Sequence, residues 1–188
     1  MKLRHLKAED FTRQPWKNGG GFTIELARGP LWRLSIADVE QSGPFSDFAG
    51  FERTIMLLSG DGMELEFDQA PTARIDRAEE PLVFDGGWKT HCRLLGGPVR
   101  DMNLMVIRES ARVTLRVLHL SAESAMLIAA PTALYYMLRG KAAFGILGLD
   151  AVVSRGELLR IDDAGGFPIP ANATEADTTI VEIGITHR

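Results

Sequence analysis

The chain has 188 residues with 45% hydrophobic and 24% charged side chains, and its formal net charge is −4. This length and composition suit one or two small globular domains, and the dispersed charge leaves no basic footprint for nucleic acid. No apolar run approaches the roughly 20 residues of a membrane helix, and MKLRHLKAEDF lacks the apolar region of a secretory signal. With a single cysteine, Cys92, we expect a cytoplasmic protein without disulfides.

Short β patterns, separated by Gly, Pro, Asp and Asn, follow one another along the chain. A period of two predicts strands with one face in a core, as in VTLRVLHL at 113–120. A helical turn is expected only near 6–12, and a short turn near 46–51. The predicted strands are 22–27, 32–39, 53–59, 63–67, 81–84, 90–95, 102–107, 113–120, 125–130, 134–139, 142–147, 151–153, 157–161 and 178–185. Many short strands without a sustained helical period predict an all-β sandwich or barrel.

An internal repeat divides this β pattern into two halves. IMLLSGDGMELEF at 55–67 aligns with YYMLRGKAAFGIL at 135–147, so that Leu58 and Gly60 fall on Leu138 and Gly140. Each copy reads as a strand, a glycine-containing turn and a second strand, which is the pattern expected of a duplicated barrel. We therefore expect domains at 1–110 and 111–188 that pack as one unit, with exchange of strands between the halves allowed.

The glycine run in WKNGGGFTIEL, residues 16–26, is the most conspicuous local motif. A phosphate-binding P-loop requires a following Lys-Ser or Lys-Thr and a helix, and here a strand pattern follows instead. The glycines are better explained by a backbone corner that needs positive φ or a close approach of two segments.

Polar residues alternate with apolar ones in several predicted strands. Arg33 shares a face with Ser35, Thr23 with Glu25, and Asp101 with Asn103. If these faces line a barrel interior, an arginine there is suited to clamp a carboxylate. The alternative is that they face solvent, as alternating polar residues on sheets commonly do.

Metal and thiol chemistry have little support in the sequence. The four histidines, at 5, 91, 119 and 187, stand singly and form no His-x-His pair, so no metal site is expected. Cys92 follows His91, but neighbouring residues of a strand point to opposite faces, so the two do not form a catalytic pair. No cofactor is expected either.

Five motifs in order resemble the HutD/Ves family of bicupin proteins. They are WKNGGGFTIE (16–25), WRLSIA (32–37), GPFSDFAGFER (43–53), LSGDG (58–62) and GGPVRDMNLM (96–105). Ala49 is a departure, since the family more often has Pro there. The resemblance implies two cupin barrels in a cytoplasmic bacterial protein that is associated with histidine utilisation and has no established enzymatic activity.

Carried onto this chain, the resemblance implies a metal-free pocket for a small acidic metabolite such as urocanate or formylglutamate. Arg53, ahead of Arg33, is expected to hold the carboxylate, and Trp16 to form an apolar wall. Two alternatives stay open: a hydrolase or isomerase with Glu25 or Asp101 as general base, and a protein that only docks a partner. A homodimer is also possible. The ligand-binding candidates are Trp16, Asn18, Thr23, Glu25, Arg33, Ser35, Ser46, Arg53, Asp101 and Asn103.

Overall fold

The computed structural model describes residues 1–146 and 148–188 and places nearly all of its regular structure in antiparallel strands. The chain divides into two compact units, one of Phe11–Ser110 and one of Met1–Asp10 together with Ala111–Arg188. The first ten residues, assigned from sequence to the first half, group with the second because β1 (Lys2–Leu6) pairs with β17 (Leu158–Asp162). A 3-10 turn at Ala8–Asp10 lies within the expected helical region.

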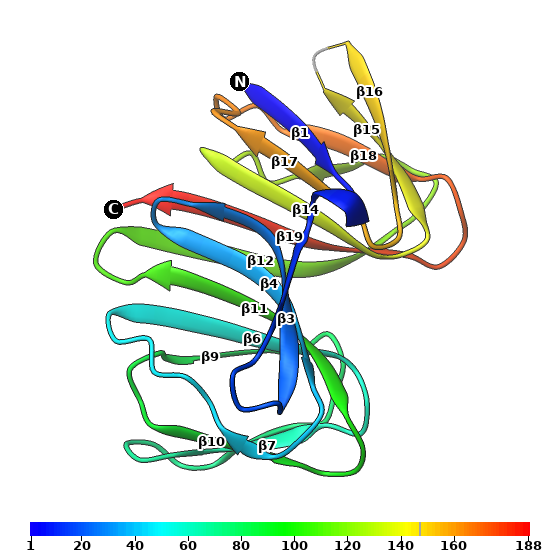
Figure 1. The fold of residues 1–188 in the computed structure, drawn as a ribbon. Helices are drawn as coiled ribbons and strands as arrows, with labels where there is room; N and C mark the ends of the chain where they lie inside the picture. The colour runs from blue at the N-terminus through cyan, green and yellow to red at the C-terminus, as the bar shows by residue number, and fades with distance from the viewer. Residues whose placement is uncertain (147) are drawn as a thin grey trace. The chain divides into compact units, whose positions relative to one another are not determined.

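The unit Phe11–Ser110 is a jelly-roll-like sandwich of two antiparallel sheets (Figure 1). The larger sheet has the order β2-β3-β4-β11-β6-β9, with bounds Thr12–Pro15, Gly21–Gly29, Trp32–Val39, Val99–Ile107, Phe51–Ser59 and Pro81–Asp85. The smaller has the order β5-β10-β7-β8, with bounds Gly43–Pro44, Thr90–Leu94, Met63–Phe67 and Ala73–Ile75. Their inner faces share one apolar core, in which Ile55 and Leu57 of the larger sheet meet Met63 and Leu65 of the smaller.

The second unit repeats this plan. Its larger sheet has the order β1-β17-β14-β19-β12, in which β14 is Thr132–Arg139, β19 is Thr178–His187 and β12 is Ala111–Leu120. Its smaller sheet has the order β13-β18-β15-β16, with bounds Ala125–Leu127, Ile169–Ala173, Lys141–Ile146 and Leu149–Ser154. The core between them is large and apolar, with Tyr135 and Phe144 in ring contact at 5.4 Å.

The internal repeat corresponds to equivalent strands of the two units. The run β4-β11-β6-β9 in one unit matches β12-β19-β14-β17 in the other. Gly60 follows β6 and Gly140 follows β14, both with positive φ. A Cβ at Gly60 would lie 2.7 Å from the Pro98 carbonyl oxygen, and one at Gly140 would lie 2.4 Å from Thr178 Oγ1. Each glycine is therefore needed where the hairpin turn passes close to the next strand.

Every strand predicted from the sequence overlaps an observed strand. The last residue of the predicted strand 142–147 lies outside the described residues. The short strands β1, β2, β5, β8 and β18 were not predicted. Among the residues described, no helix is long and apolar enough to cross a membrane.

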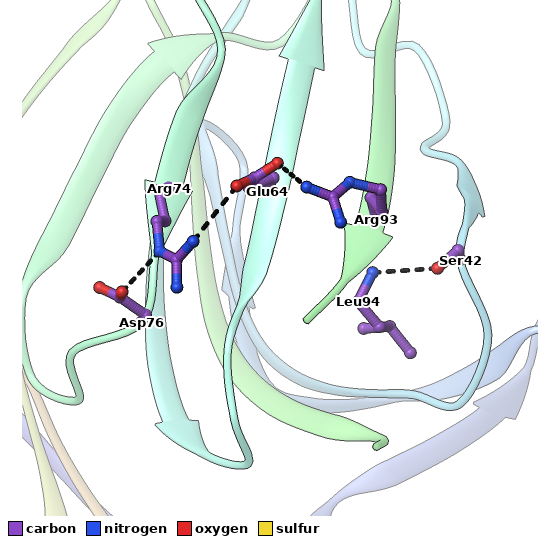
Figure 2. Close-up of polar contacts among 6 residues, drawn as sticks. All are labelled: Ser42, Glu64, Arg74, Asp76, Arg93 and Leu94. Atoms are coloured by element: carbon purple, nitrogen blue, oxygen red, sulfur yellow. Dashed lines mark hydrogen bonds and ion pairs between the residues drawn. The ribbon is translucent and has the colours of Figure 1, made fainter. Parts of the chain in front are cut away.

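The outer face of the smaller sheet in Phe11–Ser110 carries a ladder of ion pairs rather than an apolar patch (Figure 2). Glu64 of β7 lies between Arg93 of β10 and Arg74 of β8, and Arg74 Nε also donates to Asp76 at 2.6 Å. Both arginines are more than half exposed, so these pairs contribute little to stability. Charge on this face opposes pairing of the exposed sheet edge with other chains.

Candidate functional site

A cavity of about 510 Å³ lies over one face of the larger sheet in the unit Phe11–Ser110. Half of its lining comes from strands β3, β4, β6 and β11: Thr23, Arg33, Ser35, Ala37, Arg53, Asp101, Asn103 and Met105. The rest comes from two segments around the smaller β elements: Pro15, Trp16, Lys17, Asn18, Pro44, Phe45, Ser46 and Phe48. A polar strand face is thus covered by aromatic and loop residues.

Strand register brings the polar lining residues together. On β11, Asn103 lies opposite Ser35 of β4, and two residues further on Met105 lies between Arg33 of β4 and Arg53 of β6. Side chains at i and i+2 share a face of a strand. The residues paired with Asn103 and those paired with Met105 therefore project to the same side of the sheet. The alternation read from the sequence therefore marks an inward polar face at this end of the sheet.

Arg53 is the buried cation of the cavity. Its side chain is 6% exposed and is surrounded by the rings of Phe45, Phe48 and Phe84, whose centroids lie 5.0–5.6 Å from the guanidinium carbon. Its Nη2 donates to Asn103 Oδ1 at 2.7 Å, whereas Nε has no hydrogen-bond partner in the described chain. Burial lowers its pKa to about 10, with the charge of Asp101 acting in the opposite direction, so the group stays cationic at neutral pH.

Asp101 is the buried acid of the cavity and has 0% of its surface exposed to solvent. Asn103 Nδ2 donates to its Oδ1, while its Oδ2 has no hydrogen-bond partner among the described residues. Burial raises its pKa to about 7, and the nearby Arg53 only partly offsets that effect. Asn103 thus links the acid and the cation, and each retains one unused polar atom.

The glycine motif forms the corner expected of it at the cavity wall. Gly19 and Gly21 both have positive φ, and a Cβ at Gly21 would lie only 2.1 Å from the Asp38 carbonyl oxygen. This corner brings Trp16 over the cavity, where its Nε1 donates to Thr23 Oγ1 at 2.8 Å. The corner positions a wall and makes no use of a helix N-terminus, consistent with the sequence argument against a phosphate loop.

Glu25 is the one predicted site residue that does not line the cavity. Its carboxylate is bound by Arg28, at 2.5 and 2.7 Å, and by Arg33 Nε at 2.7 Å. A bulge in β3 after Glu25 alters the register with β4 and lets Arg28 reach it. The pKa of Glu25 is lowered chiefly by the hydrogen bond from Arg28 and also by the one from Arg33. Partial burial acts in the opposite direction but does not outweigh them.

The other nine candidates all line the one cavity: Trp16, Asn18, Thr23, Arg33, Ser35, Ser46, Arg53, Asp101 and Asn103. Apart from Trp16, sequence reasoning missed the aromatic and apolar lining, above all Phe45, Phe48 and Met105. Phe45 and Phe48 stand in the same GPFSDF stretch as Ser46, so that motif carried a signal for them. Whether the candidates bind a ligand stays a prediction.

The cavity residues do not fit a transition metal. The cavity lining holds one carboxylate, Asp101, no imidazole, and three cations, Lys17, Arg33 and Arg53. Across residues 1–146 and 148–188 there is no group of three or more His, Cys, Asp or Glu side chains placed to hold a metal ion. Cys92 is buried beside Met63, and burial raises the pKa of its thiol to about 12, which is unsuited to a nucleophile.

The equivalent position in the second unit is built differently. With residue 55 matched to 135, the register places Ala133 where Arg53 stands, Ile180 where Asp101 stands, and Glu182 where Asn103 stands. Glu182 is fully buried and pairs with Arg116 at 2.5 Å. The pair of Arg53 and Asp101 is therefore a feature of one unit only.

Comparison with known proteins connects the chain to a family. Residues 8–178 match the sequence profile of the HutD family. An uncharacterised 21.2 kDa protein from the hutC 3' region of Pseudomonas putida is 38% identical over 181 residues, covering 88% of this chain and 95% of the relative. Protein Ves of Citrobacter koseri is 36% identical over 109 residues, covering 54% of this chain and 56% of Ves.

Solved structures agree with these relationships. HutD from Pseudomonas fluorescens SBW25 is 31% identical and superposes over 100% of both chains with a TM-score of 0.84. A cupin 2 conserved barrel domain protein from Leptotrichia buccalis, 12% identical, covers 87% of this chain and 88% of its own with a TM-score of 0.60. The second similarity shows the fold alone, which is of the cupin type.

Proposed function

The chain belongs to the HutD family of cupin-fold proteins linked to histidine utilisation, and from this we propose that it binds a small carboxylate-bearing metabolite. The ligand occupies the cavity of the unit Phe11–Ser110, and its binding has a regulatory role in the catabolism of histidine or related amino acids.

The proposal rests on the buried Arg53, whose hydrogen-bond donors are only partly satisfied. A buried guanidinium costs free energy unless an anion or several acceptors satisfy it. Arg53 donates only to the neutral amide of Asn103, and its Nε is unused. A carboxylate is the planar acceptor that matches such a fork with two parallel hydrogen bonds.

The remaining lining gives the ligand an orientation. Ser35, Thr23 and Asn103 supply directional hydrogen bonds on one side, and Trp16 packs edge-on against Phe45 at 6.3 Å on the other. A cavity of about 510 Å³ lies in the usual range for small-molecule sites. Polar groups on one wall and aromatic rings on the other favour a compact acid with an apolar or conjugated body, such as urocanate, or formylglutamate.

Calorimetric titration of the full chain tests the proposal with urocanate, formylglutamate, formiminoglutamate and glutamate. We expect at least one of them to bind, and Arg53→Ala to weaken that binding by about 10- to 100-fold, because charge-assisted hydrogen bonds are lost. Arg74→Ala, which removes an exposed arginine of the smaller sheet, is the matched control and should bind as the parent does. The proposal fails if no acid binds, or if both arginine variants bind alike.

A second candidate, a hydrolase or isomerase acting on such an acid, is favoured by one observation. Asp101 has a pKa near 7, which suits a general base or acid, whereas Glu25 is held ionised by two arginines. Turnover of a pathway acid that Asp101→Asn abolishes, while binding persists, would favour the enzyme. Loss of turnover in Glu25→Gln with Asp101→Asn active would instead assign the base to Glu25.

A further inference from the structure

The acid of the cavity has an unused oxygen whose chemistry the proposed function does not assign. Asn103 Oδ1 accepts from Arg53, so its Nδ2 faces Asp101 and donates to Oδ1 of that residue. A proton on Asp101 therefore belongs on Oδ2, since Oδ1 is already an acceptor. Oδ2 is buried, lies in a residue that lines the cavity, and has no partner within the described chain.

Few charges face Asp101. The charge of Arg53 acts on it from β6 and that of Asp38 from β4, and Asp101 in turn influences the thiol of Cys92 on β10. Two further cations line the same cavity, Arg33, which is bound to Glu25, and Lys17 of the covering segment. A carboxylate ligand on Arg53 would thus leave two anions sharing one buried cation.

We propose that Asp101 is a specificity-determining residue that holds the bound carboxylate as a neutral acid, donating its Oδ2–H to the ligand while Arg53 donates to the same group. The inference rests on the proposed function, because it assumes a carboxylate ligand on Arg53. Where Asp101 is ionised in the free protein, binding then takes up a proton from solvent, which forms the Oδ2–H bond, and no other covalent bond is made or broken. The site selects ligands that offer an anionic acceptor over ligands that offer an N–H donor.

The physical reason is the competition between two carboxylates in a buried place. Burial, aided by the charge of Asp38 and only partly offset by Arg53, raises the pKa of Asp101 to about 7, so part of the free protein already carries this proton near neutral pH. A second negative charge at hydrogen-bond distance raises the pKa of one of the two acids further. The protonated partner is Asp101, because the ligand is the group that contacts Arg53.

Calorimetry of the full chain with formate and with N-formylglutamate tests this inference. Neither acid has a group that titrates between pH 6 and 9, so a change in affinity over this range comes from the protein. If only protonated Asp101 binds, the affinity falls about 100-fold from pH 6 to pH 9, since each pH unit above 7 removes about tenfold of the competent form. Binding enthalpies in two buffers of different ionisation enthalpy should report proton uptake.

Two variants sharpen the test. In Asp101→Asn the amide can donate where Oδ2–H did, so this variant should bind with little pH dependence and more tightly than the parent at pH 9. In Asp38→Asn, a change outside the cavity lining, the pH dependence should persist with its midpoint shifted slightly lower, because Asp38 raises the pKa of Asp101.

The outcomes separate the two proposals. Binding that is independent of pH, or that strengthens above pH 7 and is lost in Asp101→Asn, overturns the role of Asp101 while leaving the carboxylate site intact. The second pattern would mean that an ionised Asp101 accepts an N–H of the ligand. If neither acid binds at any pH, the carboxylate site itself is wrong. The parent protein alone decides this should Asp101→Asn fail to fold.

Discussion

Asp101 should make the stability of the ligand-free protein depend on pH in an unusual direction for a carboxyl group. Paired surface acids stabilise a fold as pH rises, whereas Asp101 is buried with a pKa raised from 3.8 to about 7. The folded state therefore holds the proton more tightly than the unfolded state does. Its stabilising effect is complete below pH 3.8, declines as pH rises, and is exhausted above pH 7.

The size of the effect follows from the two pKa values. Between pH 5 and pH 8 the unfolded chain has already lost this proton while the folded chain loses it only near pH 7, which amounts to about 2 to 3 kcal/mol of lost stability. Asp101→Asn cannot titrate and does not suffer this loss. For a chain of this length the difference corresponds to about 5 to 10 °C in Tm.

Denaturation of the parent and Asp101→Asn at pH 5 and pH 8 measures the effect. The quantity to compare is the difference in unfolding free energy between the two proteins, and how that difference changes from pH 5 to pH 8. Other carboxyls whose pKa is lowered, such as Glu25 and Asp85, change the unfolding free energy of both proteins equally. The amide leaves an N–H₂ in place of the unused oxygen, which costs about 1 to 3 kcal/mol at both pH values and so cancels. Equal stability differences at the two pH values, or a parent that gains on the variant at pH 8, would refute the reasoning. Asp38→Asn leaves Asp101 able to titrate and should therefore still lose stability between pH 5 and pH 8.

Two further predictions concern the scaffold. Gly21→Ala should lower the free energy of unfolding by about 2 kcal/mol or more in a denaturation assay, because the added Cβ would lie 2.1 Å from the Asp38 carbonyl oxygen. Gly97→Ala, where a Cβ would meet open space, should have little effect in the same assay. Cys92 should react with iodoacetamide far more slowly in the native protein than after unfolding, since it is buried with a pKa raised to about 12; rapid native alkylation would show that the strand around it opens.

Several of the larger strands could be predicted from the sequence because their apolar and polar residues alternate. WRLSIADV gives β4 at Trp32–Val39 because Trp32, Leu34 and Ile36 alternate with Arg33 and Ser35. The short strands β5 and β8, of two and three residues, carry no period of their own. They exist because the neighbouring strands β10 and β7 offer unpaired backbone groups, which is a property of the tertiary fold.

The candidate site was predictable where a polar residue occupied the inward position of a strand, as with Asn103 and Ser35. Glu25 shows where this reasoning ends. Its alternation with Thr23 placed it on the cavity wall, but the bulge after it and the two arginines that reach it are decided by the fold. The proximity of Arg53 to Asn103, 50 positions away in the chain, likewise follows only from strand pairing.

The two units differ in the residues that fill equivalent positions of their larger sheets. Equivalent strands build both larger sheets, yet the position of Arg53 in one is held by Ala133 in the other, and that of Asp101 by Ile180. Beside these small and apolar residues the second unit fills its interior with Tyr135 and Phe144, both fully buried. An interior packed in this way stabilises the fold, whereas two buried ionisable groups with unused atoms destabilise it. Under the proposed function, the carboxylate of the ligand offsets this cost, because it supplies the acceptor that Arg53 and a protonated Asp101 lack in the free protein.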